Sequence, residues 1–319
     1  MSRPRVVCLV GPTASGKTAL ALALAPTLGA EVVSVDSRQV YRDMDIGTAK
    51  PTRAERAAVP HHCLDLVEPE DGFDAARFRV AASAAIADVR GRGRVPLIAG
   101  GTGLWLRVLL RGLCPAPASA PALRAELEQL AAVQGVAALH ARLGGVDPIA
   151  AARLHPNDRV RVVRALEVAL GTGKPLSAWQ AAHRFGETPY DALVIGLAVE
   201  PDALGEWVAT RARAMIAGGW LDEVRALVAR GVPDDAPAWR SVGYRELRAH
   251  VRGAVDLETA LAATVRATRR FAGRQRRWFR SEPDVVWRDP RRDAVRIADE
   301  VTGFLRLGRR PLPAPPPAR

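Results

Sequence analysis

An eight-residue segment near the N-terminus, Gly11-Pro12-Thr13-Ala14-Ser15-Gly16-Lys17-Thr18, is the most informative part of the sequence. An apolar run at residues 6–10 precedes it, and a segment rich in alanine and leucine at residues 19–24 follows. Strand, glycine loop and helix in this order, with Gly-x-x-x-x-Gly-Lys-Thr between them, form the phosphate-binding P-loop. Glycines let backbone amides turn toward anionic oxygens, and the positive end of the following helix adds to that field. The motif predicts a phosphate or diphosphate site, with Lys17 supplying charge and the Thr18 hydroxyl holding magnesium.

Length and composition bound the class of protein. A chain of 319 residues is long for one domain, so we expect a core with an insertion or a second domain. The three cysteines are far apart, which is typical of neither a disulfide framework nor a zinc site and fits the reducing cytosol. The N-terminus leaves no room for a signal peptide, and every apolar stretch is too short to span a membrane. We expect a cytoplasmic protein, and nothing in the sequence demands more than a monomer.

The formal net charge of +12 comes mostly from arginine. Such a balance favours a polyanionic partner such as nucleic acid. A solvated basic surface is the plainer interpretation, so charge alone decides little.

A second ligand-binding segment is expected after the P-loop helix, which Pro26 and Gly29 should end. Residues 31–35 read as a buried parallel strand that delivers Asp36 to the carboxyl edge of the sheet, where ligands bind. The polar segment that follows, residues 37–51, lacks helical periodicity and predicts a functional loop.

Three roles for Asp36 remain open at this point. Its carboxylate could cap a turn, assist magnesium binding from the second shell, or act as a general base beside the phosphate site. It lies only eighteen residues after Thr18, and the later strand at residues 95–99 ends in glycines instead of an acid. Both observations weaken an ATPase or GTPase interpretation.

Two weaker signals follow along the chain. Gly100-Gly101-Thr102-Gly103 joins the strand at 95–99 to a helix and, beside a P-loop, would face the same crevice. His61-His62 invites a metal hypothesis, but adjacent histidines point in different directions and no further ligand cluster follows, so a structural role is favoured.

The composition changes at a proline-rich linker, residues 114–121. Only helical patterns follow until a strand at residues 193–199, and these patterns cover residues 122–134, 135–143, 148–154 and 158–171. We expect a helical insertion at residues 113–189 within an α/β core made of residues 1–112 and 190–306. The proline-rich tail at residues 307–319 is expected to be disordered.

One helix, residues 257–280, is dense in arginine. Four of these arginines fall on one stripe by three-and-four spacing: Arg266, Arg270, Arg274 and Arg277. Aligned positive charges oppose helix formation unless anions meet them, so this helix is the best local indication of a nucleic-acid track. The arginines at 159, 161 and 164 in the insertion also indicate contact with a nucleic-acid backbone.

Several segments resemble, in this order, those of the bacterial tRNA dimethylallyltransferases: residues 11–18, 36–51, 61–62, 100–104, 155–158, 240–246 and 274–280. The likeness runs from about residue 5 to 285, and the run Asp36-Ser37-Arg38-Gln39-Val40-Tyr41-Arg42-Asp43-Met44-Asp45-Ile46-Gly47-Thr48-Ala49-Lys50-Pro51 is specific by itself. The resemblance implies an α/β fold with a P-loop NTPase-like parallel sheet and a helical insertion that clasps the tRNA anticodon stem-loop. It also implies a Mg²⁺-dependent enzyme that transfers a dimethylallyl group from dimethylallyl diphosphate to N6 of adenosine 37, giving N6-(dimethylallyl)adenosine and diphosphate.

The resemblance also implies roles for single residues. The P-loop, residues 11–18, would hold the diphosphate, with Thr18 on magnesium. Asp36 would take the proton from the adenine amine, Thr102 would lie at the reacting centre, and Arg211 would contact the diphosphate. The residues expected to contact tRNA include two arginines of the helix at residues 257–280. The full set is Asp36, Ser37, Arg38, Gln39, Thr102, Arg124, Val160, Arg161, Val162, Val163, Arg164, Arg240, Tyr244, Arg245, Arg270 and Arg274.

The chain departs from the family pattern at two positions. Val160 stands where glutamine is usual, which puts one tRNA contact in doubt, and Trp105 replaces the familiar tyrosine. Two other classes compete with the prenyltransferase. One is a P-loop kinase in which Asp36 would activate a hydroxyl and ATP would be the donor. The other is a non-catalytic RNA-binding protein that uses the P-loop as a switch.

Overall fold

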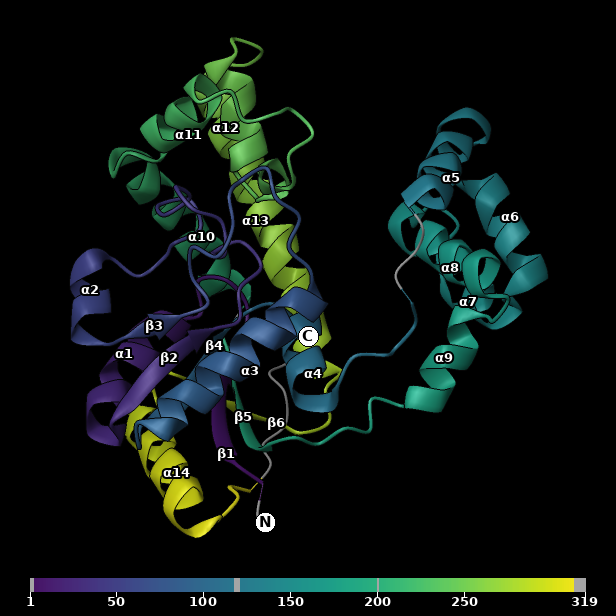
Figure 1. The fold of residues 1–319 in the computed structure, drawn as a ribbon. Coiled ribbons are helices and arrows are strands. Elements are labelled where there is room, and N and C mark those ends of the chain that lie inside the picture. Colours follow the sequence, from purple (N-terminus) through teal and green to yellow (C-terminus); the bar gives the residue numbers. More distant parts are fainter. Residues whose placement is uncertain (1–2, 118–120, 200, 313–319) are drawn as a thin grey trace. The chain divides into compact units, whose positions relative to one another are not determined.

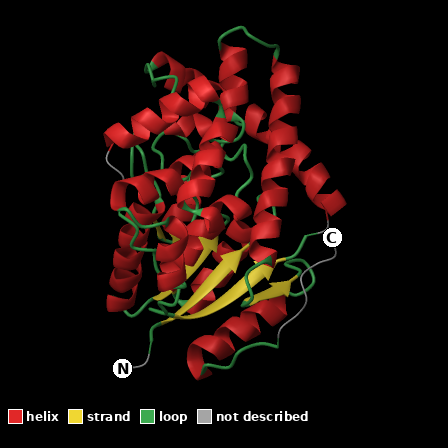
Figure 2. Ribbon diagram, turned by 90° about the vertical axis from the view of Figure 1, so that its right-hand side faces the viewer, coloured by secondary structure: helices red, strands yellow, loops and turns green. Residues whose placement is uncertain are grey.

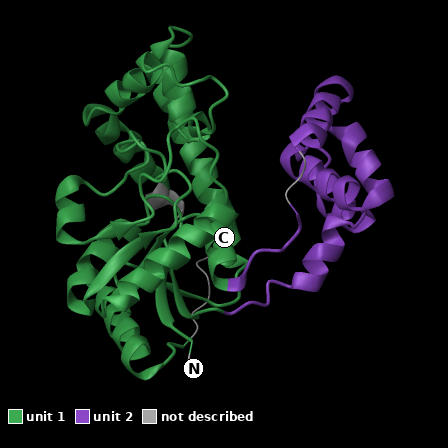
Figure 3. Cartoon of the chain, viewed as in Figure 1, with its two compact units in different colours: residues 1–110, 189–319 green, residues 111–188 purple. Residues whose placement is uncertain are grey.

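The computed structural model describes residues 3–117, 121–199 and 201–312. The chain divides into two compact units, residues 1–110 with 189–319, and residues 111–188 (Figure 3). In the described residues, no helix combines the length and the apolar character needed to cross a bilayer.

The first unit is built on a parallel sheet with the strand order β3-β2-β4-β1-β5-β6 (Figure 1). Its strands are β1 (Arg5–Val10), β2 (Ala30–Ser34), β3 (His61–His62), β4 (Val95–Gly100), β5 (Asp191–Leu197) and β6 (Val285–Arg288). Strand β1 lies between β4 and β5, with Val7 opposite both Leu97 and Leu193. The predicted α/β class with a parallel sheet is therefore confirmed, and the P-loop follows an interior strand.

Helices cover both faces of this sheet (Figures 1 and 2). One face carries α1 (Lys17–Leu28) and α14 (Ala294–Leu307), and the other carries α3 (Ala75–Gly91) and α4 (Gly103–Arg111). Successive side chains of a strand point to opposite faces, so Val7 and Leu9 pack with α1 and α14, whereas Cys8 and Val10 pack with α3 and α4. Strands buried on both faces explain the continuous apolar runs of the sequence.

Further helices of the first unit lie beyond the carboxyl ends of the strands (Figure 1). They are α10 (Pro201–Ala217), α11 (Trp220–Ala229), the 3-10 helix η1 (Pro237–Arg240), α12 (Tyr244–Val251) and α13 (Leu257–Arg280), while α2 (Arg53–Ala58) follows the loop of residues 36–51. Helix α13 has the predicted bounds. These helices and the loop enclose the crevice at the strand ends.

The second unit consists of α5 (Pro121–Gln134), α6 (Val136–Val146), α7 (Pro148–Arg153), α8 (Arg159–Thr172) and α9 (Leu176–His183). Its own core forms around Leu127, Leu143 and Leu166. Asp147 is fully buried, and its carboxylate accepts hydrogen bonds from the amides of Ala150 at 3.0 Å and Ser177 at 2.9 Å. One buried carboxylate thus satisfies the first turns of both α7 and α9.

The structure corrects several local predictions. Pro26 lies inside α1, and the helix ends only at Gly29, whose φ of 60° suits a glycine. Elements that were not predicted from the sequence include α2, α9, α12, α14 and β6. Leu307, the first residue of the predicted disordered tail, ends α14, and Arg310 beyond it pairs with Asp191. Residues 313–319 lie outside the described residues.

Candidate active site

The P-loop connects β1 to α1 through two unusual glycines. Gly11 has a φ of 152°, and Gly16 has a φ of 83° and forms the N-cap of α1. An added Cβ at Gly11 would lie 3.2 Å from the carbonyl oxygen of Leu197 on β5. No described side chain caps α1, so its first backbone amides and the helix dipole are left to a bound anion.

Lys17 keeps its ammonium inside this loop. Its Nζ donates hydrogen bonds to the carbonyl oxygens of Gly11 at 3.0 Å and Pro12 at 2.6 Å. Burial lowers the Lys17 pKa to about 8, with nearby Asp36 raising it and Arg211 lowering it further. In the same loop the buried Ser15 hydroxyl has no hydrogen-bond partner among the described residues. The loop therefore holds both a cation and a polar group that an anionic ligand could engage.

Asp36 follows β2 and is oriented by its own turn. Its Oδ1 accepts a hydrogen bond from the Arg38 amide at 2.8 Å. One carboxylate oxygen of Asp36 therefore caps the turn, which was one of the three roles considered for this residue. The next amide, of Ser37, donates to the Thr102 hydroxyl at 2.9 Å. An added Cβ at Gly100 would lie 2.4 Å from the Val35 carbonyl oxygen. The second glycine turn is therefore needed for the ends of β2 and β4 to meet beside Asp36.

Two cavities meet at Asp36. A polar cavity of about 390 Å³ is lined by residues 13–19, Asp36 and Arg211, and a smaller one of about 190 Å³ lies beside it. The smaller cavity has apolar walls contributed by Val208, Ala212, Met215, Trp220, Val242 and Phe271. Both are lined by Thr13, Ala14, Asp36, Thr48, Ala49, Arg211 and Phe271. A molecule with an anionic and an apolar end could occupy the pair.

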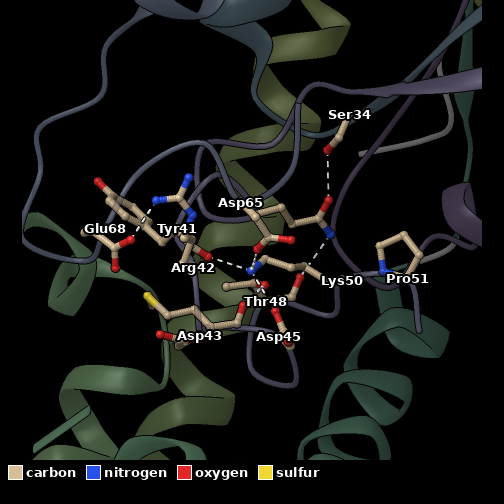
Figure 4. Close-up of polar contacts among 12 residues, drawn as sticks. Ser34, Tyr41, Arg42, Asp43, Asp45, Thr48, Lys50, Pro51, Asp65 and Glu68 are labelled. Carbon is tan, nitrogen blue, oxygen red and sulfur yellow. Dashed lines mark hydrogen bonds and ion pairs between the residues drawn. The ribbon is translucent and has the colours of Figure 1, made fainter. Parts of the chain in front are cut away.

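Polar contacts centred on Lys50 shape the loop of residues 36–51 (Figure 4). The Lys50 side chain is fully buried, and its Nζ donates to the Tyr41 carbonyl oxygen at 2.5 Å. It also pairs with Asp45 at 2.7 Å and Asp65 at 2.5 Å. A buried ammonium with these three partners keeps the loop in one conformation.

Gln39 belongs to the same loop. Its Oε1 accepts from the Ser34 hydroxyl at 2.8 Å, and its Nε2 donates to the carbonyl oxygens of Thr48 at 3.2 Å and Ala49 at 3.1 Å. These contacts occupy the amide that we expected to contact tRNA. The structure therefore gives Gln39 a role in shaping the wall of the cavity.

A second contact fixes the loop to the helices above it. The Glu223 carboxylate accepts hydrogen bonds from the amides of Asp45 at 2.6 Å, Ile46 at 2.7 Å and Gly47 at 3.2 Å, and from the Tyr244 hydroxyl at 2.5 Å. The Tyr244 side chain is fully buried, so a contact with tRNA at this residue would have to come from its backbone. Burial and the neighbouring Glu223 raise the Tyr244 pKa well above its usual value, so the phenol keeps its proton.

We expect Tyr244→Phe to lower the free energy of unfolding by about 2 kcal/mol, because a hydrogen bond to a charged group is lost. The dissociation constant for tRNA should stay within about twofold of the wild-type value, because the phenol is buried. Urea unfolding and filter binding measure the two quantities. A large loss of tRNA affinity at unchanged stability would instead support the prediction that the Tyr244 side chain contacts tRNA.

Arginines gather around a third cavity of about 460 Å³. It is lined by Arg240, Arg245, Arg248, Arg270 and Arg274, with Asp234, Asp235 and Glu246 as its acidic members. Arg240, Arg245, Arg270 and Arg274 are exposed, as direct contact with RNA would require. This cavity shares Arg240, Ser241, Val242 and Arg274 with the small apolar cavity. The basic surface therefore adjoins the site at Asp36.

Within the second unit, the predicted tRNA-contacting residues differ in exposure. Val160 is 66% exposed, and Arg161 is exposed and pairs with Asp158 at 2.9 Å. Val162 and Val163 are fully buried in the core of the unit, so side-chain contact with tRNA is excluded for both. Arg124 and Arg164 lie 3.5 and 3.6 Å from the buried Glu167 carboxylate.

The histidine pair is structural. His61 contacts the Val59 carbonyl oxygen at 2.6 Å, and His62 contacts the Glu31 carboxylate at 2.7 Å. The described residues contain no cluster of three or more histidine, cysteine or acidic side chains that could hold a metal. Magnesium needs no such cluster, because it is usually held by one or two carboxylates, waters and substrate phosphates. Thr18 and Asp36, which line the polar cavity, offer oxygen atoms of this kind.

Pattern analysis missed two side chains that organise the site. Glu223 on α11 binds the loop of residues 36–51, and Gln275 on α13 contacts both glycine turns. Gln275 had a readable signal, since it falls four residues from both Phe271 and Phe279 on the apolar side of its helix. Glu223 had none, because nothing local distinguishes it from any exposed acid.

Comparison with known proteins agrees with this geometry. A family model described as IPP transferase matches residues 39–282, and one described as Isopentenyl transferase matches residues 4–72. The chain is 55% identical over 297 residues to a tRNA dimethylallyltransferase of Anaeromyxobacter dehalogenans (strain 2CP-C), covering 93% of this chain and 99% of the relative. It is 49% identical over 302 residues to that of Geobacter metallireducens, covering 95% and 98%.

Solved structures give the same result. The full-length tRNA isopentenylpyrophosphate transferase of Bacillus halodurans matches with a TM-score of 0.70 and 37% identity, over 95% of this chain and 97% of that one. A eukaryotic dimethylallyltransferase captured acting on tRNA matches with a TM-score of 0.83 and 25% identity, over 97% and 81%. The family expected from the sequence is confirmed. The chain belongs to the IPP transferase family.

Proposed function

We propose that the protein transfers a dimethylallyl group from dimethylallyl diphosphate to N6 of adenosine 37 in tRNA. The observation that carries this proposal is the joined pair of cavities, a polar one and a smaller one that has apolar side chains beside its polar groups, with Asp36 lining both. The polar cavity suits the diphosphate, and the smaller one suits a short hydrocarbon chain. The relatives named above are tRNA dimethylallyltransferases, which supports the same activity here.

Departure of diphosphate from the allylic carbon requires that its developing negative charge be neutralised. Lys17, the amides at the start of α1 and Arg211 face the polar cavity and would supply that neutralisation. A Mg²⁺ ion held by Thr18 and the diphosphate, with Asp36 nearby, would add further positive charge when bound.

The exocyclic amine of adenine is a weak nucleophile and loses a proton as the new bond forms. Asp36 would accept this proton as a general base, because its carboxylate lies where the two cavities meet. The hydrogen bond from the Arg38 amide orients the carboxylate, and the bond between Ser37 and Thr102 holds that turn in place. Adenine must leave its base stack to reach this point.

The exposed arginines would bind the tRNA backbone. In the first unit these are Arg240, Arg245, Arg270 and Arg274, and in the second they include Arg124 and Arg161, with the half-buried Arg164 beside them. A single small acceptor, such as a P-loop kinase would use, needs no such surface. We expect a cytoplasmic monomer with tRNA and the prenyl donor as its partners.

Replacing Arg270 and Arg274 together by glutamine should reduce the slope of log K against log salt for tRNA binding by about 2, one unit per lost phosphate contact. The matched control replaces Arg90 and Arg306, which are also exposed but line none of the three cavities, and it should leave the slope unchanged. Equal slopes for the first pair and the wild type would remove α13 from the tRNA interface.

Nucleoside analysis of tRNA from cells with and without this protein tests the function. We expect N6-(dimethylallyl)adenosine and nucleosides made from it to disappear without the protein, and to return with the wild-type chain but not with Asp36→Asn. Unchanged nucleosides in the deleted strain would refute the proposal.

A further inference from the structure

Gln275 lies on α13, is 7% exposed, and joins the two glycine turns of the site. Its Oε1 accepts a hydrogen bond from the Thr13 amide of the P-loop at 2.8 Å. Its Nε2 donates to the carbonyl oxygen of Gly101 at 3.0 Å. One side-chain amide therefore uses both its acceptor and its donor on two loops that lie 88 residues apart in the sequence.

The second glycine turn is shaped to admit α13. An added Cβ at Gly101 would lie 2.2 Å from Nε2 of Gln275, and one at Gly103 would lie 2.1 Å from the indole of Trp278. Either would displace the helix from the turn. Trp278 is in turn covered by the Arg107 guanidinium, 4.3 Å from its ring centre. Glycine is therefore needed at both positions so that α13 can pack closely against this turn. This reason for the glycines could not be predicted from the sequence.

Both contacts of Gln275 reach groups beside Asp36. Thr13 lines the polar and the apolar cavity, so its position sets one wall of the junction between them. Gly101 precedes Thr102, whose hydroxyl holds the Ser37 amide next to Asp36. A shift of either loop would change the distance between the diphosphate site and the carboxylate.

Helix α13 also carries the exposed arginines Arg270, Arg274 and Arg277 on another side. Gln275 follows Arg274 directly in the chain. The helix that is proposed to bind tRNA is therefore fastened to the diphosphate loop by a buried hydrogen bond.

We propose that Gln275 is a positioning residue that holds the P-loop and the Gly100–Gly103 turn in register, so that the donor diphosphate and Asp36 face the same point. Its effect on transfer rests on the proposed function, whereas its effect on diphosphate affinity does not. A misplacement of about 1 Å at a reacting centre can cost about 10²-fold in rate.

Gln275→Met removes both hydrogen bonds at similar size and should weaken binding of inorganic diphosphate with Mg²⁺ about 10-fold, the effect of two lost hydrogen bonds. It should lower kcat by more than it changes KM for tRNA. The control Gln134→Met makes the same change at an exposed position at the end of α5, which lines none of the three cavities, so diphosphate affinity should stay at the wild-type value. Thermal unfolding monitors the fold of each variant.

Gln275→Glu gives a test that does not depend on the methionine variant folding. The ionised side chain keeps an acceptor for Thr13 but has no donor for Gly101, whereas the protonated form has both. Because position 275 is buried, we expect desolvation to raise the pKa of the introduced carboxyl above its usual value. As pH falls through that pKa, the rate of the variant relative to the wild type should rise about 10-fold.

A diphosphate affinity of Gln275→Met within twofold of the wild type would overturn the proposal, as would a rate ratio for Gln275→Glu that stays flat across the titration of the introduced carboxyl, followed by NMR. Absence of any transfer by the wild-type protein would instead count against the proposed function. In that case the diphosphate measurements would still decide the role of Gln275.

Discussion

Asp36→Asn is expected to slow prenyl transfer by about 10²–10⁴-fold, the usual contribution of a general base, with tRNA affinity within about twofold of the wild type. Asparagine keeps an oxygen that can accept the Arg38 amide, so the turn should survive. The variant loses the ability to take a proton and also the negative charge beside Lys17, so the rate is measured with the donor at saturation. Single-turnover rates at saturating donor, with separate tRNA binding curves, measure the two effects.

Asp43→Asn is the matched control for this substitution. Asp43 belongs to the same loop, is exposed, and has a φ of 58° that asparagine adopts readily. Its ion pair with Arg230 lies on the surface, so the rate should change little. If Asp36→Asn lowered tRNA affinity as much as rate, the general-base role would be wrong and Asp36 would be a binding residue.

Lys17→Met is expected to lower kcat/KM for the donor by about 10²–10³-fold, as removal of one group that stabilises developing charge typically does. The loss has a pH signature. The Lys17 pKa is lowered to about 8, so its ammonium is charged below that pH and increasingly neutral above it. Binding of inorganic diphosphate to the wild type should therefore weaken as pH rises through about 8. The variant should lose this weakening and keep only the pH dependence that comes from the titration of diphosphate itself.

Lys174→Met controls for the loss of a lysine as such. Lys174 lies in the second unit, where its ammonium stacks 4.3 Å from the centre of the Trp179 ring. Calorimetric titration with diphosphate between pH 7 and pH 9.5 compares the three proteins. If Lys17→Met kept the wild-type pH dependence, another group would carry the diphosphate charge.

Much of the fold could be predicted because its signals are local. The P-loop motif, the apolar runs of β1 and β4, and the periodicity of α13 each lie within one short segment. The missed elements lacked such signals. Strand β6 has four residues and is placed by pairing with β5 and by burial of its side chains in the core. Helix α14 is fixed by packing on the sheet face that it shares with α1.

The site divides in the same way. Asp36, Lys17 and Arg211 were predicted as site residues from the sequence and its family resemblance. In the structure all three line one cavity. The family resemblance assigns a role to a whole segment and says nothing about which of its side chains are buried. It therefore could not show that Tyr244, Val162 and Val163 are buried in the hydrophobic cores of their units. Contacts such as those of Glu223 depend on chain segments more than 170 residues apart.

The most direct test uses purified protein, unmodified tRNA, Mg²⁺ and dimethylallyl diphosphate labelled in both the prenyl carbon and the phosphorus. We predict that carbon label enters one adenosine of the anticodon loop at N6, with one diphosphate released per label and no ATP required. Carbon label that stays out of the RNA, or ATP consumed in its place, would contradict a P-loop that holds a prenyl donor.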